Sequence, residues 1–195
     1  MEELILDMNK RYSYADYLTW MDDVRRELID GFIKLMSPAP NRIHQEISVN
    51  LERNFINFLY KKQCKIYHAP SDVRFPKNNT EQTDKQTLTV VQPDIYVVCD
   101  PSKLDEKGCL GAPDLIIEIV SPRNHKRDID EKFRLYEENK VREYWIVFPY
   151  ESTVLVYLLD DNGKYQQKGI FADDDKIPVN IFNGDLVVDL TEVFE

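Results

Sequence analysis

Residues 111–149 read GAPDLIIEIVSPRNHKRDIDEKFRLYEENKVREYWIVFP, and this stretch decides the fold. Its first part, residues 113–121, is dense in Ile and Val, which is typical of a strand covered on both faces. Residues 127–140 predict an amphipathic helix, because their apolar side chains recur at helical spacing. Residues 143–149 then predict another buried strand. Strands that alternate with a helix indicate an α/β protein.

The rest of the chain continues this pattern on both sides. The further predicted elements are a short helix over 12–22, a hairpin that turns at Asp30-Gly31, a helix over 41–62, single strands over 65–75 and 90–100, and a hairpin meander from 152 onward. No Gly/Ser linker divides the sequence. We therefore expect a single domain over residues 1–195, with a central mixed β-sheet flanked by helices and a C-terminal β meander.

Composition limits the classes of protein that remain. A net charge of −10 argues against a general nucleic-acid coating protein, since such binding relies on Lys and Arg at phosphates. Acidic residues could instead gather at a metal site, or the partner could be something other than nucleic acid. The apolar runs are too short to span a bilayer, and the acidic N-terminus does not resemble a signal peptide, which predicts a cytoplasmic protein. Without C-x-x-C spacing, the cysteines predict reduced thiols, not a disulfide frame or zinc site: Cys64, Cys99 and Cys109.

Two carboxylates lie among Ile and Val in predicted buried strands. Asp94 is followed by Ile95 to Val98, and Glu118 is flanked by isoleucines. A buried carboxylate is unfavourable unless it is paired, hydrogen-bonded or bound to metal. Each could be a salt-bridged residue of the sheet, or could face water at a strand end. Two of them on neighbouring strands instead suggest one shared cation, and hard oxygen ligands favour Mg²⁺ or Mn²⁺.

The helix over 127–140 supplies a candidate cation. Asp128 and Lys132 are four residues apart, so they share one face of this helix. An ordinary surface ion pair between them is one interpretation. In the other, this flank of the helix lies across the strand ends, where the ammonium could orient water or stabilise transition-state charge.

These residues resemble the PD-(D/E)XK nuclease superfamily. Pro93-Asp94 is followed 24 positions later by Glu118-Ile119-Val120. Residues 111–149, together with the segments ELIDGFIKLMSPAPNRIHQEI, APSDVRF and VQPDIYVV, are similar to the Uma-two family of restriction-endonuclease-like proteins. The similarity covers roughly residues 10–160. It implies a restriction-endonuclease-like core that uses a divalent metal to hydrolyse phosphodiesters.

The resemblance also implies roles for individual residues. Asp94, Glu118 and Lys132 would be catalytic, and the metal ligands would be Asp94, Glu118 and Ile119. Val120 stands where the superfamily motif has its lysine, and Lys132, in the following helix, would replace it. Possible supporting residues are His44, Glu46 and Asp128. His44 could equally be a histidine of the core, and Glu46 could equally be a solvated surface carboxylate.

Three functions remain open from sequence. The first is a metal-dependent DNA endonuclease, in which a homodimer would be the simplest way to cut two strands. The second is a catalytically silent member of the fold that serves as an interaction or assembly module, which the acidity and the missing in-strand lysine favour. The third is a hydrolase of another phosphoester, such as RNA or a nucleotide.

Overall fold

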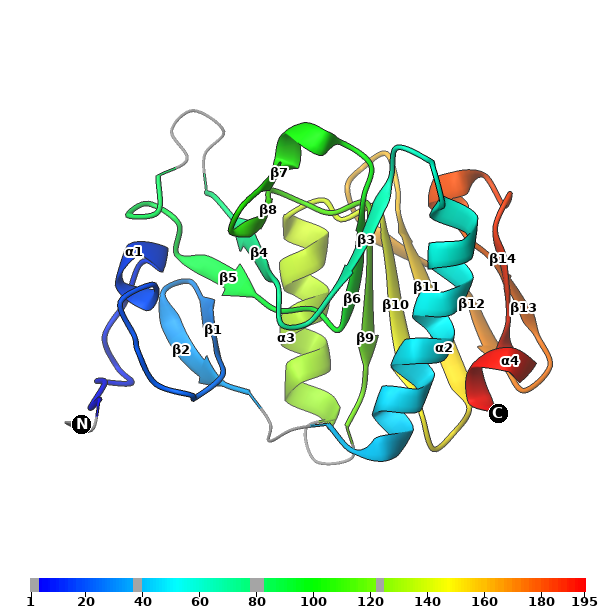
Figure 1. Cartoon of the computed structure of the whole chain (residues 1–195), viewed down its shortest axis with the longest axis horizontal. Coiled ribbons are helices and arrows are strands. Elements are labelled where there is room, and N and C mark those ends of the chain that lie inside the picture. The colour runs from blue at the N-terminus through cyan, green and yellow to red at the C-terminus, as the bar shows by residue number, and fades with distance from the viewer. Residues whose placement is uncertain (1–3, 37–39, 78–82, 122–124) are drawn as a thin grey trace.

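A mixed six-stranded sheet forms the centre of the molecule in a computed structural model that describes residues 4–36, 40–77, 83–121 and 125–195. We call it the core sheet; its strand order is β12-β11-β10-β9-β6-β3 (Figure 1). β9 and β10 run parallel, and the other neighbouring pairs run antiparallel. The strands are β3 (Lys65–His68), β6 (Ile95–Val98), β9 (Leu115–Ile119), β10 (Glu143–Phe148), β11 (Thr153–Leu159) and β12 (Tyr165–Ala172).

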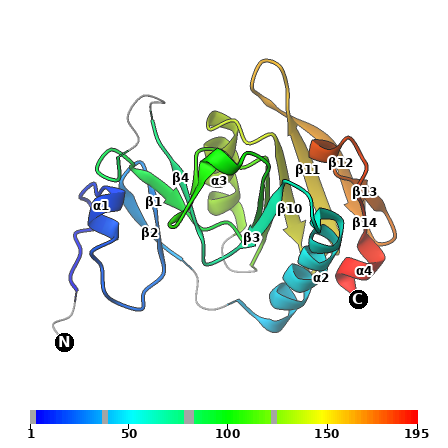
Figure 2. The ribbon, with the colours of Figure 1, turned by 45° about the horizontal axis from the view of Figure 1, so that its top comes forward.

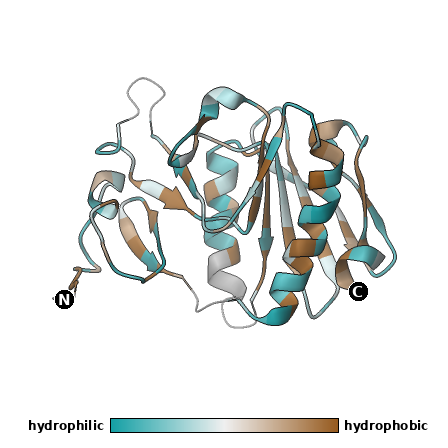
Figure 3. Cartoon of the chain, viewed as in Figure 1, coloured by the Kyte–Doolittle hydropathy of each residue, from teal (hydrophilic) through white to brown (hydrophobic). Residues whose placement is uncertain are grey.

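Two helices cover the two faces of the core sheet. α2 (Arg42–Leu59), which Asn41 caps, buries its apolar stripe against Leu115, Ile117 and Ile119 of β9. α3 (His125–Glu138) covers the other face, where Tyr136 packs with Ile116. Successive strand residues point to opposite faces, so β9 is apolar on both. Figure 3 shows the matching stripes of apolar and polar residues along α2. The fold class expected from the sequence is confirmed.

A second six-stranded sheet lies beside the core sheet. Its order is β2-β1-β5-β4-β8-β7. The predicted hairpin is present, with positive φ angles at Asp30 and Gly31 between β1 and β2. α1 (Tyr14–Tyr17), capped by Ser13, and this hairpin lie at one end of the molecule in Figures 1 and 2. The strands are β1 (Arg26–Ile29), β2 (Phe32–Leu35), β4 (Asp72–Phe75), β5 (Thr89–Val91), β7 (Leu104–Asp105) and β8 (Gly108–Leu110).

Two predicted strands are wrong in the same way, because each is divided between the two sheets. Residues 65–75 form β3 in the core sheet and β4 in the second sheet, with Pro70 between them. Residues 90–100 contribute to β5 in the second sheet and β6 in the core sheet, with Pro93 between them. Proline has no N–H to donate to a ladder, so pairing is interrupted at these positions and the chain passes to the other sheet.

The C-terminal part completes the opposite end of the molecule. β11 and β12 form the antiparallel hairpin that the sequence predicted from 152 onward, and β10, predicted as a separate buried strand, pairs antiparallel with β11. After it come β13 (Lys176–Pro178), β14 (Val187–Asp189) and α4 (Leu190–Phe194), which pack in the same apolar cluster as α2. Short 3-10 turns lie at Pro101–Lys103 and Asn180–Phe182. Among the described residues, no helix has the length and apolar content needed to cross a membrane.

The cysteines correct another expectation. Cys64 and Cys99 are joined by a disulfide, and Cys109 is a buried free thiol. The bonded pair is 35 residues apart in sequence and lies next to the Lys65–Val98 pair of β3 and β6. Register between two strands brought these cysteines together, which spacing along the chain does not show.

Candidate active site

Asp94 and Glu118 meet at one end of the core sheet. β6 and β9 are antiparallel, with Ile95 opposite Ile117. Asp94 directly precedes β6, so continuing this register by one residue places it opposite Glu118. Residues opposite one another on such a pair point to the same face. The sequence predicted neighbouring strands correctly, but Asp94 lies at the start of β6 instead of inside a longer strand.

The Asp94 carboxylate is fixed by two donors. The backbone N–H of Ile119 donates to its Oδ2 at 2.8 Å, and His44 Nε2 lies 3.2 Å from the same oxygen. Burial would lower the pKa of His44, but the hydrogen bond and charge of Asp94, with the charge of Glu118, raise it overall. His44 comes from the first turn of α2, and its backbone N–H donates to the cap Asn41. The start of α2 therefore orients Asp94.

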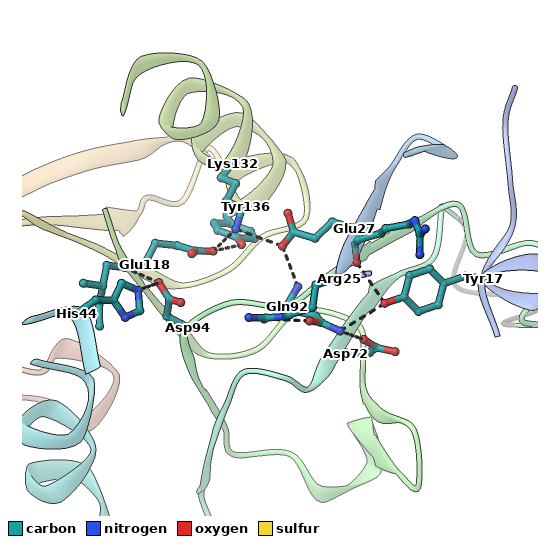
Figure 4. Close-up of polar contacts among 12 residues, drawn as sticks. Tyr17, Arg25, Glu27, His44, Asp72, Gln92, Asp94, Glu118, Lys132 and Tyr136 are labelled. Carbon is teal, nitrogen blue, oxygen red and sulfur yellow. Dashed lines mark hydrogen bonds and ion pairs between the residues drawn. The ribbon is translucent and has the colours of Figure 1, made fainter. Parts of the chain in front are cut away.

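Glu118 is held by two side chains of α3. Lys132 Nζ lies 2.9 Å from Glu118 Oε1, and the Tyr136 hydroxyl donates to the same oxygen at 2.6 Å (Figure 4). Lys132 and Tyr136 are four residues apart, so they share one side of the helix. Burial, together with the charges of Asp94 and Glu27, raises the pKa of Glu118 to about 7, against the opposing effects of Lys132 and Tyr136. Its proton affinity is thus set by a buried cluster of charges.

Lys132 is the centre of this cluster. Its Nζ also lies 3.2 Å from Glu27 Oε1, and only 17% of its side chain is exposed. Burial would lower the pKa of Lys132, but Glu118, Glu27 and Asp94 raise it overall, so the ammonium stays charged. The sequence placed Lys132 on a flank of α3 beside the buried stripe; in the structure it is half-buried and lies between carboxylates of two sheets. The side chain of Asp128 lies outside the described residues.

Glu27 is a site residue that the sequence analysis missed. It lies in β1 of the second sheet, is 5% exposed, and accepts the backbone N–H of Gln92 at 2.9 Å. Its neighbours in sequence are Arg25 and Arg26 on one side and Leu28 and Ile29 on the other. The available signal was the one used for Asp94 and Glu118, an acid beside apolar strand residues.

Gln92 links the site to a second polar network (Figure 4). Its amide nitrogen donates to Asp72 at 3.0 Å and to the Tyr17 hydroxyl at 3.4 Å, and its amide oxygen accepts from Arg25 at 3.1 Å. Gln92 lies in the crossing between β5 and β6, two residues before Asp94. This network therefore ties the second sheet to the sheet end that carries the acids.

A cleft of about 840 Å³ opens over these groups. Residues of both sheets and the start of α2 line it, including Arg25, Glu27, Lys34, His44, Asp94, Glu118 and Lys132. Ile119 also lines it, but its side chain packs in the core, so it can offer a metal only its carbonyl oxygen. Glu46 is not part of this lining; it pairs with Arg42 at 2.6 Å on the exposed side of α2. The structure thus brings together all the predicted residues except Glu46 and the undescribed side chain of Asp128.

The raised pKa of Glu118 predicts a pH-dependent stability in the metal-free protein. The pKa of this carboxyl rises on folding, from 4.5 to about 7. Above pH 7 the folded protein must hold the unfavourable charged form, which lowers the free energy of unfolding, whereas below pH 4.5 the group is protonated in both states and has no such effect. Glu118→Gln removes this term. Its free energy of unfolding, relative to wild type, should therefore rise by up to about 3 kcal/mol across this pH range. Urea unfolding with EDTA at about pH 5 and pH 8 measures the change. For Glu46→Gln, the difference in free energy of unfolding from wild type should be the same at both pH values. The same result for Glu118→Gln would contradict the interpretation of a buried charge cluster.

Comparison with known proteins gives three concordant matches. The family model Uma2, described as "Putative restriction endonuclease", matches residues 14–191. The uncharacterized protein slr1290 of Synechocystis sp. is 31% identical over 158 residues, which cover 80% of this chain and 78% of that protein. The crystal structure of a "putative nuclease belonging to DUF820" from Anabaena variabilis superposes with a TM-score of 0.71 at 21% identity, covering 94% of this chain and 97% of that one. This last similarity concerns the fold.

Proposed function

The chain belongs to the Uma2 family of restriction-endonuclease-like proteins, and on that premise we propose that it is a metal-dependent endonuclease that hydrolyses phosphodiester bonds of DNA. The observation that carries the proposal is the meeting of Asp94 and Glu118 at one sheet end, with the Lys132 ammonium 2.9 Å from Glu118. The cleft above them opens these groups to a substrate.

The donor set fits Mg²⁺ or Mn²⁺. Magnesium is usually bound by one or two carboxylates, with water and substrate phosphate as further ligands. Asp94, Glu118 and the carbonyl oxygen of Ile119 would provide the protein ligands. Both described donors to Glu118 use Oε1, so its Oε2 would be the oxygen that binds the ion. Within the described part of the chain, no group of three His, Cys, Asp or Glu side chains forms a cage by itself. Such an ion, when bound, supplies an activated water and neutralises charge on the phosphoryl oxygen.

The protein residues would supply orientation and charge. His44 and the Ile119 N–H fix the Asp94 carboxylate before substrate arrives. The Lys132 ammonium is already held at the site, so it can stabilise a developing negative charge without rearrangement.

The silent-module alternative rests on the same ion pairs. Lys132 contacts both Glu118 and Glu27, an arrangement that would also stabilise the junction of the two sheets without any chemistry. Metal binding separates the two interpretations, because a purely structural cluster has no need of a cation.

The test combines cleavage with metal-dependent stability. Plasmid, single-stranded DNA and RNA should be incubated with Mg²⁺, Mn²⁺ or EDTA at low and moderate salt. We expect metal-dependent cleavage of DNA, and linear plasmid without accumulated nicked product would support a homodimer. Mg²⁺ or Mn²⁺ should also raise the Tm of wild type by preferential binding to the native state. The Asp94→Asn/Glu118→Gln double variant should lose this rise. No cleavage of any substrate, with no metal effect on Tm, would favour the silent module.

A further inference from the structure

Within the described residues, the charged side chains that line the cleft form ion pairs, with the exception of Arg25. Lys34 contacts Glu131 at 2.6 Å, and Lys132 contacts Glu118 and Glu27. Arg25 lines the same cleft, but within the described residues its partner is the neutral amide oxygen of Gln92 at 3.1 Å, and it forms no ion pair there. A guanidinium fixed in a cleft without a carboxylate partner is suited to an external anion.

The donors of Arg25 are also incompletely used. Its Nε is buried and, in the described part of the molecule, has no hydrogen-bond acceptor. A buried donor on a charged group is costly to leave without a partner. Arg25 as a whole is only partly buried and lines the cleft, so the terminal nitrogens of its guanidinium, one of which binds Gln92, are the donors that an external phosphate would use. The phosphate would also supply the countercharge that the described residues do not give this side chain.

The position of Arg25 relative to the acids is fixed by Gln92. The Gln92 amide that accepts from Arg25 is itself held by Asp72 and Tyr17. The backbone of Gln92 donates to Glu27 and continues through Pro93 into Asp94. The guanidinium therefore belongs to a rigid frame shared with the candidate metal ligands, although it comes from the second sheet.

We propose that Arg25 binds a backbone phosphate of the nucleic acid, and that the nucleic-acid strand to be cut lies in the cleft between the β1–β2 hairpin and the core sheet. This inference rests on the proposed function for its substrate, but it concerns binding and not hydrolysis. In this arrangement the second sheet binds the nucleic-acid strand, and the core sheet carries the groups that take part in hydrolysis.

Binding to a fluorescent DNA duplex, measured by anisotropy in EDTA, tests this assignment apart from cleavage. Arg25→Gln should raise Kd at least about tenfold and reduce the slope of log K against log salt by about one. Arg25→Lys keeps the charge but loses the planar fork, so its Kd should lie between the two. Arg53→Gln removes the same charge from the exposed side of α2 and should leave Kd within about twofold.

The outcomes separate this inference from the proposed function. Duplex binding that depends on Arg25, in a wild type that cleaves nothing, would support the phosphate site and overturn the hydrolysis. Equal losses in Arg25→Gln and Arg53→Gln would show a general charge effect and overturn the site. Absence of any duplex binding by wild type would also overturn it. Thermal unfolding of each variant shows that a weakened Kd does not come from unfolded protein.

Discussion

Asp94→Asn is expected to reduce DNA cleavage to about one thousandth of the wild-type rate or less, while the protein remains folded. Asparagine has the same shape and keeps an oxygen that can accept the Ile119 N–H, so the local structure should persist. The charge that binds a cation is lost, and metal catalysis contributes several kcal/mol of transition-state stabilisation. Since about 1.4 kcal/mol corresponds to a factor of ten, this loss amounts to roughly a thousandfold.

Initial rates of plasmid cleavage with Mg²⁺ measure this effect, and Glu46→Gln provides the matched control. Glu46 is an acid of the same region that the sequence also nominated, but it pairs with Arg42 outside the cleft lining. Its neutral variant should cleave at the wild-type rate. A rate for Asp94→Asn within tenfold of wild type would remove Asp94 from the chemistry.

The sequence predicted the parts of the site that a single strand or helix displays. Glu118 stands out because isoleucines flank it in one uninterrupted strand, and α3 is visible from its apolar spacing. His44 could be nominated because it lies at the start of the longest helix. These are local patterns, and the burial of strand and helix faces follows directly from them.

The rest of the site depends on how two sheets meet, which local patterns do not contain. Glu27 becomes a site residue only because β1 belongs to a second sheet that lies beside the core sheet. Gln92 gains its role because the chain changes sheets there, while residues 90–100 looked like one strand. The disulfide of Cys64 and Cys99 depends on the register of β3 and β6 in the same way. Such contacts are set by tertiary pairing and are invisible to spacing along the chain.

Lys132→Met should cause the largest loss of stability among single variants of the site. Methionine keeps the length of the aliphatic stem but removes the ammonium between Glu118 and Glu27. The side chains of Glu118 and Glu27, of which only 12% and 7% of the surface is exposed, would then lose their shared cation. Removing one partner of a buried ion pair typically costs about 3–5 kcal/mol. Denaturant unfolding at about pH 8 measures the loss, and Lys34→Met, which breaks a more exposed pair with Glu131, should cost about 1 kcal/mol or less.

The double variant Lys132→Met/Glu27→Gln separates the structural role of Lys132 from its catalytic one. Neutralising Glu27 removes one of the two unpaired charges, so the double variant should recover a large part of the stability that Lys132→Met loses. It does not restore a cation beside Glu118. If the ammonium stabilises transition-state charge, cleavage should stay at least about a hundredfold below wild type in the double variant, with the metal effect on Tm retained. Cleavage that recovers together with stability would show that Lys132 serves only to hold the two sheets together. Loss of cleavage without recovery of stability would mean that the cluster depends on more than this one pair of carboxylates.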